Sequence, residues 1–367
     1  MKSDTIASDG RRRRVEREIS GRSTSTSPRD ELQSQAVVFV VPNEVMFTHW
    51  TVEKSRLGSE EVLLQTEASV VSPGTELAVL GGGEAWAPLP QVPGYGSVGR
   101  GLVVGSNVRG MGVGDRHFAN GAHAAKRYSA SVSVRVSAGL SSLDAVFARI
   151  GQIAMTALRI SEARLGDFVA VLGLGSIGNM AAQLFALSGC EVIGIDPSAG
   201  RAARAGACGV NHTLSPEDNL VERVRQITGG RMCRTVVDAT GAAAVIETAP
   251  ALAGSLGEVI LLGSPRGAHR SDLTGFLNQV HLWKNGCITI KGAHEWRLPV
   301  REDPTGRVLV SMEGNVKSLL QLLAEGRLNI EPLKSHVVSP TKAAEIYAGL
   351  TSDKEHHLGV VFDWSRV

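Results

Sequence analysis

The sequence has few aromatic residues, few cysteines and no long apolar segment, and each shortage excludes a class of protein. Aromatic side chains make up 4% of the 367 residues, which argues against an aromatic-rich platform for carbohydrate or single-stranded nucleic acid. Cys190, Cys208, Cys233 and Cys287 form no CxxC motif, so we expect reduced thiols in a cytoplasmic protein. No apolar run reaches the roughly 18 residues that a membrane span needs, and no signal peptide is predicted.

The sequence also lacks an excess of charge of one sign. The net charge of +2 arises in residues 1–34, which hold eight Lys and Arg against six Asp and Glu. The remainder is neutral, which argues against a nucleic-acid partner because phosphate neutralisation needs a basic face. The basic run 11–14 is followed by Glu16 and Glu18, so residues 1–34 are predicted to be a disordered, solvated tail. Nucleic-acid binding by this tail is the alternative.

Glycine is abundant, with 42 residues, and its placement indicates the first domain. A β-branched run at 36–41 and further strand candidates at 62–64 and 69–71 are followed by glycine-rich breaks at 81–83 and 94–101. Short strands between such turns predict an antiparallel, barrel-like domain up to about residue 150.

The pattern then changes to strands that alternate with helices. Strands are predicted at 168–172, 191–195, 235–238 and 258–262, and helices at 177–187, 199–207, 216–228 and 242–253. Alternation of this kind predicts βαβ units, and therefore an α/β fold with a doubly wound parallel sheet. Two further helices, at 315–325 and 341–350, and a closing strand at 360–362 are expected near the C-terminus.

The most specific motif is Gly173-Leu-Gly175-Ser-Ile-Gly178, between a predicted strand and a predicted helix. The three glycines would permit a tight turn, close approach of a pyrophosphate, and close helix–strand packing, and the helix N-terminus would supply N–H donors. Asp196 follows at the end of the next strand, where a carboxylate would bond ribose hydroxyls and repel a 2′-phosphate. The motif predicts NAD rather than NADP. Arg201 and Arg204 follow Asp196 closely and slightly weaken this preference. The alternative is that Asp196 only caps a helix.

With this turn near residue 173 and a β-rich region before it, the chain resembles the medium-chain dehydrogenase/reductase superfamily. The other segments that carry the resemblance are Ser72-Pro-Gly-Thr-Glu76, Pro93-Gly-Tyr-Gly-Ser-Val-Gly99, Gly112-Val-Gly-Asp-Arg116, Asp238-Ala-Thr-Gly241 and Leu262-Gly-Ser-Pro-Arg-Gly267. The resemblance implies a GroES-like catalytic domain over 35–155 and 300–367, with a Rossmann NAD-binding domain inserted at 156–299. It also implies a homodimer formed through the Rossmann sheet edge near 281–295.

The sequence differs from the metal-dependent members at their zinc ligands. Those members hold zinc through Cys, His, and Cys or Glu, and the matching positions here are Pro73, Tyr95 and about Ala148. No cysteine precedes Cys190, so the four-cysteine structural zinc loop is absent as well. We therefore expect no metal, and the chain is similar to the zinc-independent branch that contains dehydrogenases of pigment and secondary metabolism.

Without zinc, side chains must polarise the carbonyl and transfer the proton. By position in the family, Thr75 matches the proton-relay hydroxyl, Tyr95 replaces a zinc ligand, and His294 lies where the chain meets the nicotinamide. Each has a structural alternative: Thr75 as a turn residue, the Tyr95 ring as a space filler, and His294 as a surface residue.

The resemblance assigns further residues to the site. Cofactor contacts are implied for the three glycines of the turn and for Ser176, Ile177, Asp196, Thr240, Leu262, Gly263, Ser264 and Ala293. Substrate contacts are implied for Glu76, Trp86, His123, Arg266 and Glu295, with ordinary packing or solvent exposure as the alternative for Trp86, His123 and Arg266.

These observations favour an NAD-dependent, zinc-independent oxidoreductase that interconverts a secondary alcohol and a ketone on a small, hydroxylated or cyclic metabolite. Three alternatives stay open: a quinone or enoyl reductase, a redox-neutral enzyme with tightly bound NAD, and a cofactor-binding structural protein.

Overall fold

The computed structural model describes residues 30–129, 132–217 and 219–367, which divide into two compact units. Unit 1 runs to Arg149 and resumes from Lys334 to Val367, and unit 2 is Ile150–Leu333. The segment 300–333, predicted to belong to the catalytic domain, falls in unit 2. Its helix α10 (Met312–Ala324) packs against α4 (Ala148–Ile160). Leu319 of α10 lies so close to Gly151 of α4 that a Cβ added to this glycine would be 2.7 Å from Leu319 Cδ2.

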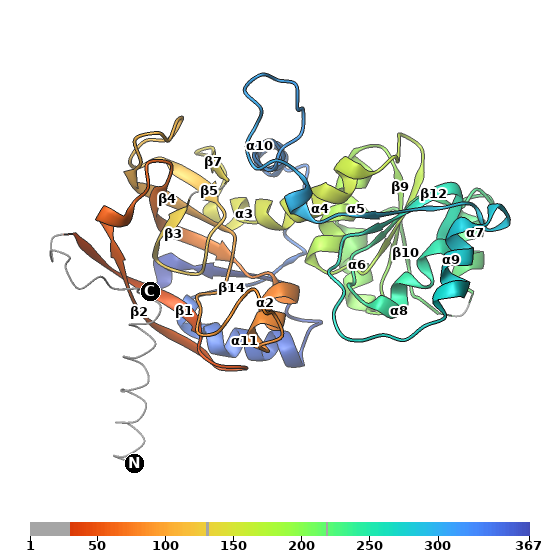
Figure 1. Cartoon of the computed structure of the whole chain (residues 1–367), viewed down its shortest axis with the longest axis horizontal. Coiled ribbons are helices and arrows are strands. Elements are labelled where there is room, and N and C mark those ends of the chain that lie inside the picture. Colours follow the sequence, from red (N-terminus) through yellow and green to blue (C-terminus); the bar gives the residue numbers. More distant parts are fainter. Residues whose placement is uncertain (1–29, 130–131, 218) are drawn as a thin grey trace, which may run out of the picture. The chain divides into compact units, whose positions relative to one another are not determined.

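Unit 1 is built on one large, mostly antiparallel sheet (Figure 1). Its strand order is β14-β15-β3-β4-β5-β7, and β6 also pairs with β3. The bounds are β3 Val62–Val70, β4 Ser97–Val104, β5 Arg116–Ala119, β6 Lys126–Ser129, β7 Ser133–Arg135, β14 Lys334–Val338 and β15 Gly359–Asp363. Because β15 pairs with β3 at Val361 and Val70, the C-terminal segment completes the sheet of the N-terminal segment.

A separate two-stranded sheet pairs β1 (Glu31–Phe39) with β2 (Val45–Glu53). The predicted tail therefore ends before residue 34, because residues 31–34 already pair with β2 through backbone hydrogen bonds that need no apolar pattern. The rest of that tail prediction, over 1–29, lies outside the described residues.

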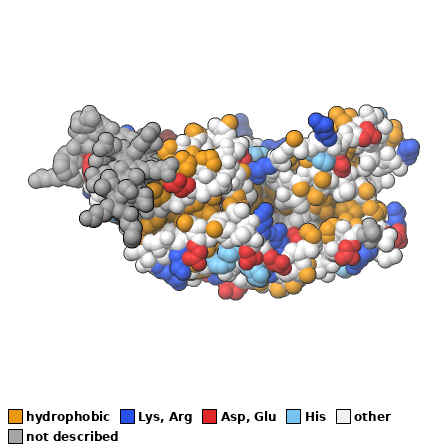
Figure 2. All heavy atoms as spheres, turned by 90° about the horizontal axis from the view of Figure 1, so that it is seen from below, with side chains coloured by type: hydrophobic (Ala, Val, Ile, Leu, Met, Phe, Trp, Pro, Cys, Tyr) orange, Lys and Arg blue, Asp and Glu red, His pale blue; other side chains and the backbone are white. Residues whose placement is uncertain are grey.

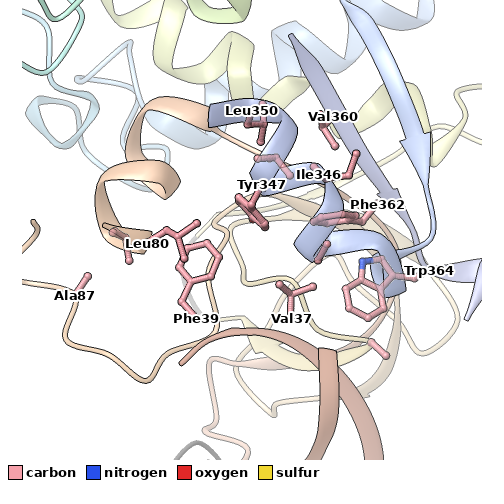
Figure 3. Packing of buried hydrophobic residues seen from close by; sticks show 14 residues of the cluster. Val37, Phe39, Leu80, Ala87, Ile346, Tyr347, Leu350, Val360, Phe362 and Trp364 are labelled. Carbon is pink, nitrogen blue, oxygen red and sulfur yellow. The ribbon is translucent and has the colours of Figure 1, made fainter. Parts of the chain in front are cut away.

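The core of unit 1 lies between β1, helix α2 (Pro73–Leu80) and helix α11 (Ala343–Ser352) (Figure 3). Figure 3 shows Phe39 and Leu80 facing Tyr347 of α11. The rings of Phe39 and Tyr347 meet edge to face, with centroids 4.9 Å apart. This packing fixes α2, which carries Thr75 and Glu76.

Unit 2 contains a six-stranded parallel sheet, which confirms the predicted doubly wound α/β architecture. The order β10-β9-β8-β11-β12-β13 reverses direction at β8, so right-handed connections place helices on both faces. The strands are β8 Phe168–Leu172, β9 Glu191–Ile195, β10 His212–Leu214, β11 Cys233–Asp238, β12 Ala253–Leu261 and β13 Thr289–Gly292. The helices include α5 Ser176–Leu187, α6 Ala199–Ala207, α7 Leu220–Ile227 and α9 Leu273–His281.

One predicted helix of unit 2 is wrong. The segment 242–253 forms two short turns, α8 (Ala243–Ile246) and the 3₁₀ helix η2 (Ala249–Leu252), because Pro250 stands at the start of the second.

Among the described residues, no helix is both long and apolar enough to cross a membrane. Lys and Arg side chains alternate with Asp and Glu over the face in Figure 2, in line with the small net charge.

Candidate active site

The glycine-rich turn joins β8 to α5 at the point where the strand order reverses. Gly173 has φ +86°, and a Cβ there would lie 2.8 Å from Thr240 Cγ2. A Cβ on Gly178 would lie 1.8 Å from the Gly173 carbonyl oxygen, so only glycine lets α5 start this close to the strand. Gly175 precedes Ser176, the first residue of α5, and its Cβ position has no heavy atom within 4 Å. The turn therefore leaves open space beside the N–H groups of the helix N-terminus.

Asp196 follows β9 and holds this turn in place. Its Oδ2 accepts a hydrogen bond from Leu174 N at 2.7 Å, and its Oδ1 accepts one from Ser198 N at 2.8 Å. Arg201 Nη1 is 3.8 Å from Oδ2. The N-cap of α6 is Ser198, not Asp196. Because each carboxylate oxygen accepts two hydrogen bonds, this buried group retains acceptor capacity for a ribose hydroxyl.

The other predicted cofactor residues of unit 2 follow the carboxyl ends of neighbouring parallel strands. Leu262 N and Gly263 N each donate to the Asp238 carbonyl at 2.8 Å, and Ala293 N donates to the Leu261 carbonyl at 2.9 Å. A Cβ on Gly241 would lie 2.5 Å from the Ser264 carbonyl oxygen. The turns after β8, β11 and β12 thus pack on one another, as expected at a nucleotide-binding sheet edge.

Unit 1 holds the phenol of Tyr95 in a polar and cationic setting. The Tyr95 hydroxyl donates to Ser72 Oγ and is hydrogen-bonded to the Thr75 side chain. The Arg149 guanidinium lies 4.5 Å from the ring centroid. Burial raises the pKa of Tyr95 above its usual value, while Arg149 and the two hydroxyls act in the opposite direction. The phenol is therefore protonated at neutral pH.

A buried carboxylate, Glu76, lies behind this phenol. Its Oε1 accepts from Ser72 N at 2.8 Å, and its Oε2 accepts from the Tyr347 hydroxyl and lies 3.1 Å from His123 Nε2. His123 Nδ1 is 2.8 Å from Ser69 Oγ, which accepts from the Trp364 indole at 2.9 Å. If His123 donates from Nε2 to Glu76 and accepts from the Ser69 hydroxyl at Nδ1, every group in this chain of hydrogen bonds has a partner.

Glu76 and His123, predicted to contact substrate, are thus buried and bonded to protein on each polar atom. They support Ser72, and through it Tyr95, rather than facing open space. Sequence reasoning missed Ser72, although it stands in the motif that contains Glu76. It also missed Arg149, Tyr347 and Trp364, for which no local pattern gives a signal.

The remaining predicted residues are mostly exposed. His294 precedes the 3₁₀ helix η4 (Glu295–Arg297), and its Nδ1 accepts from Trp296 N at 3.4 Å. Trp86 is 67% exposed, and its indole donates to Glu84 at 2.8 Å. Arg266 lies in the exposed loop after β12 and donates to the Ser264 carbonyl at 3.4 Å.

The side chains at the family's zinc positions do not fit a zinc ion. Pro73 opens α2, Ala148 is buried, and the Tyr95 phenol is hydrogen-bonded to hydroxyls with a guanidinium on its ring. No group of three His, Cys, Asp or Glu residues that could hold a metal occurs within 30–129, 132–217 and 219–367. A second cation beside Arg149 would also be repelled.

The chain is similar to known dehydrogenases. The zinc-binding dehydrogenase family matches residues 176–299. D-guloside 3-dehydrogenase of Shigella flexneri is 35% identical over 113 residues, which are 30% of this chain and 32% of that protein. The chain thus spans about a third of the length of this curated relative.

Solved structures share the fold over nearly their whole length. A Sinorhizobium meliloti protein bound to NADP, described as a zinc-binding dehydrogenase, has a TM-score of 0.74 at 18% identity. An Escherichia coli alcohol dehydrogenase complexed with NADH has a TM-score of 0.75 at 15% identity. Each alignment covers 90% of this chain and 99% of the other. The family match over residues 176–299 supports the medium-chain dehydrogenase/reductase superfamily of alcohol dehydrogenase-like oxidoreductases, and the solved structures show that the chain shares their fold.

Proposed function

We propose that the protein is an NAD-dependent, zinc-independent oxidoreductase that interconverts a secondary alcohol and a ketone on a small, hydroxylated or cyclic metabolite. The observation that carries this proposal is the Tyr95 phenol, held by Ser72 and flanked by Arg149, at a position where metal-dependent relatives have a zinc ligand. The similarity to a D-guloside 3-dehydrogenase supports a hydroxylated cyclic substrate.

The glycine-rich turn and Asp196 fit NAD. The open space at Gly175, next to the first N–H groups of α5, suits a pyrophosphate, and the Asp196 carboxylate suits ribose hydroxyls. A 2′-phosphate would meet the negative charge of Asp196, with which Arg201 is already paired. When bound, the nicotinamide accepts a hydride from the alcohol or returns one to the ketone.

Tyr95 supplies the proton that accompanies ketone reduction, and its phenolate form accepts the proton in alcohol oxidation. Its phenol is protonated at neutral pH, and the neighbouring Arg149 cation stabilises the phenolate that is left after donation. The hydroxyls of Ser72 and Thr75 hold the phenol oxygen in place through hydrogen bonds. We assign the role to Tyr95 rather than His294, because His294 is exposed and accepts a backbone hydrogen bond.

Replacing Tyr95 by Phe tests the proposal. Loss of the general acid should lower kcat by about 100-fold or more in both directions, with NADH binding unchanged. The matched control is Tyr128→Phe, since that phenol donates to the Glu53 carbonyl elsewhere in unit 1. Steady-state kinetics on a panel of polyols and their ketones, with fluorescence titration of NADH, measure both effects.

Full turnover in Tyr95→Phe would show that Tyr95 is not the general acid. Stoichiometric zinc in the active protein, with activity lost on chelation, would refute zinc independence. Turnover of enones but not of alcohols would favour the quinone or enoyl reductase alternative. NAD that survives purification without net redox turnover would favour the redox-neutral alternative.

A further inference from the structure

A polar cavity of about 400 Å³ lies at the end of the parallel sheet opposite to the glycine-rich turn. It is lined by residues that precede or begin β11, β12 and β13, among them Met232, Gly254 and Gly286. The glycine-rich turn follows the carboxyl end of β8, whereas these residues stand at the amino ends of parallel neighbours. The cavity is therefore distinct from the predicted cofactor site.

Three cations and no carboxylate line this cavity. Arg225, Arg231 and Lys284 contribute the charge, and Gln279 and Ser255 add an amide and a hydroxyl. Arg225 is partly neutralised by Glu222 at 3.4 Å. Within the described part of the chain, neither Arg231 nor Lys284 is paired with a carboxylate. Unpaired cations around a polar cavity create a positive potential that favours an anion.

The Arg231 guanidinium is also held in position. It lies 4.9 Å from the ring centroid of Phe168, at the amino end of β8. Stacking on an aromatic face restricts the guanidinium and leaves its N–H edge available for hydrogen bonds. A planar, restrained guanidinium is the group that binds phosphate through two parallel hydrogen bonds.

Unusual backbone conformations gather around the same cavity. Met232 has φ +60°, and Leu256 and Cys287, next to the lining residues Ser255 and Gly286, have φ +58° and +51°. The other non-glycine residues with positive φ in the described chain are asparagines, which tolerate this region. Leu256 N donates to the Gly286 carbonyl at 2.6 Å, which ties the two turns together. Such conformations concentrate where the chain is shaped around a ligand.

We propose that this cavity binds a small phosphorylated metabolite, with Arg231 and Lys284 as the principal phosphate ligands. The volume suits a molecule of the size of a sugar phosphate. The proposal needs no assumption about the redox reaction, because none of its residues belongs to the Tyr95 cluster or to the glycine-rich turn.

Isothermal titration calorimetry of the full chain, saturated with NADH to occupy the nucleotide site, tests the proposal. The probes are glucose 6-phosphate, glucose and inorganic phosphate. We expect binding of glucose 6-phosphate, weaker binding of inorganic phosphate and none of glucose. Arg231→Gln and Lys284→Gln should each weaken binding at least tenfold. The matched control Arg223→Gln removes the same charge from an exposed position on α7 outside the cavity and should change the Kd less than twofold.

Absence of binding of both phosphate probes at millimolar concentration would overturn the proposal. Equal weakening in Arg223→Gln and Arg231→Gln would also overturn it, because the effect would then reflect net charge rather than a site. Thermal unfolding of each variant without probe shows whether it is folded. An Arg231→Gln variant that fails to fold is replaced by Arg231→Lys, which keeps the charge but not the two parallel hydrogen bonds and should still bind at least fivefold more weakly.

Discussion

Gly96 decides where the Arg149 guanidinium lies. A Cβ on Gly96 would be only 2.3 Å from Arg149 Cγ, so any other residue would displace the arginine stem. The absence of a side chain at 96 therefore lets a buried cation stack on the adjacent Tyr95 ring. The charge beside the proposed acid thus depends on a residue that contributes no chemistry of its own.

The buried imidazole of His117 is expected to make stability depend on pH. Burial lowers the pKa of His117 from 6.5 to about 4, with Asp115 opposing and Arg135 reinforcing the shift. Between these pH values the unfolded chain binds a proton that the folded protein does not. Stability should therefore be lost as the pH falls from about 6.5 toward 4, by about 2–3 kcal/mol in total.

Urea unfolding of the wild type and of His117→Gln at pH 7.5, 5.5 and 4.5 measures this loss. The wild type should lose about 2 kcal/mol more than the variant over this range, because glutamine binds no proton in either state. His49→Gln, at an exposed position on β2, is the control and should keep the pH dependence of the wild type. Identical pH dependence in wild type and His117→Gln would contradict the prediction.

At the scale of elements, Glu76 joins three parts of unit 1. It lies on α2, bonds Tyr347 of α11, and bonds His123 in the loop before β6. Replacing Glu76 by Ala would leave three buried donors without their acceptor. We expect a loss of about 3–5 kcal/mol of unfolding free energy.

Chemical denaturation of the full chain checks this estimate. Glu345→Ala removes an exposed carboxylate from α11 and should change stability by less than about 0.5 kcal/mol. Glu76→Gln keeps one acceptor oxygen and should fall between the two. A loss below 1 kcal/mol in Glu76→Ala would show that the carboxylate does not hold these elements together.

Elements with local signals were predictable from the sequence, and contacts between distant segments were not. The strands 168–172 and 191–195 and the helix 199–207 have the predicted bounds, because a continuous apolar run or a helical period marks each one. The glycine-rich turn was equally predictable, because its three glycines lie within six residues between a strand and a helix. Gly173 and Gly178 have steric reasons within the protein, whereas Gly175 leaves open space. The Glu76–Tyr347 bond spans 271 residues, and no pattern in either segment indicates the other.

At the scale of the whole molecule, unit 2 has an open sheet edge. The strand β13 ends the order β10-β9-β8-β11-β12-β13 and pairs only with β12 among the described strands. Large apolar side chains are exposed on it and on neighbouring elements, namely Ile290, Leu256, Leu277 and Trp283. An edge of this kind is a template for pairing with another chain. We propose that two copies pair their β13 strands to form the homodimer that the family resemblance implies.

A charge placed on this edge should therefore separate the subunits. Ile290→Asp would bring two carboxylates and an unpaired polar surface into the interface, so the protein should elute as a 38.7 kDa monomer instead of a particle of twice that mass. Size-exclusion chromatography with light scattering measures the change. The control is Thr213→Asp on β10, an exposed position at the opposite edge of the same sheet, which should remain dimeric. Dissociation by Thr213→Asp but not by Ile290→Asp would place the interface at the β10 edge. A wild type that elutes as a monomer would show that β13 does not pair with a second copy.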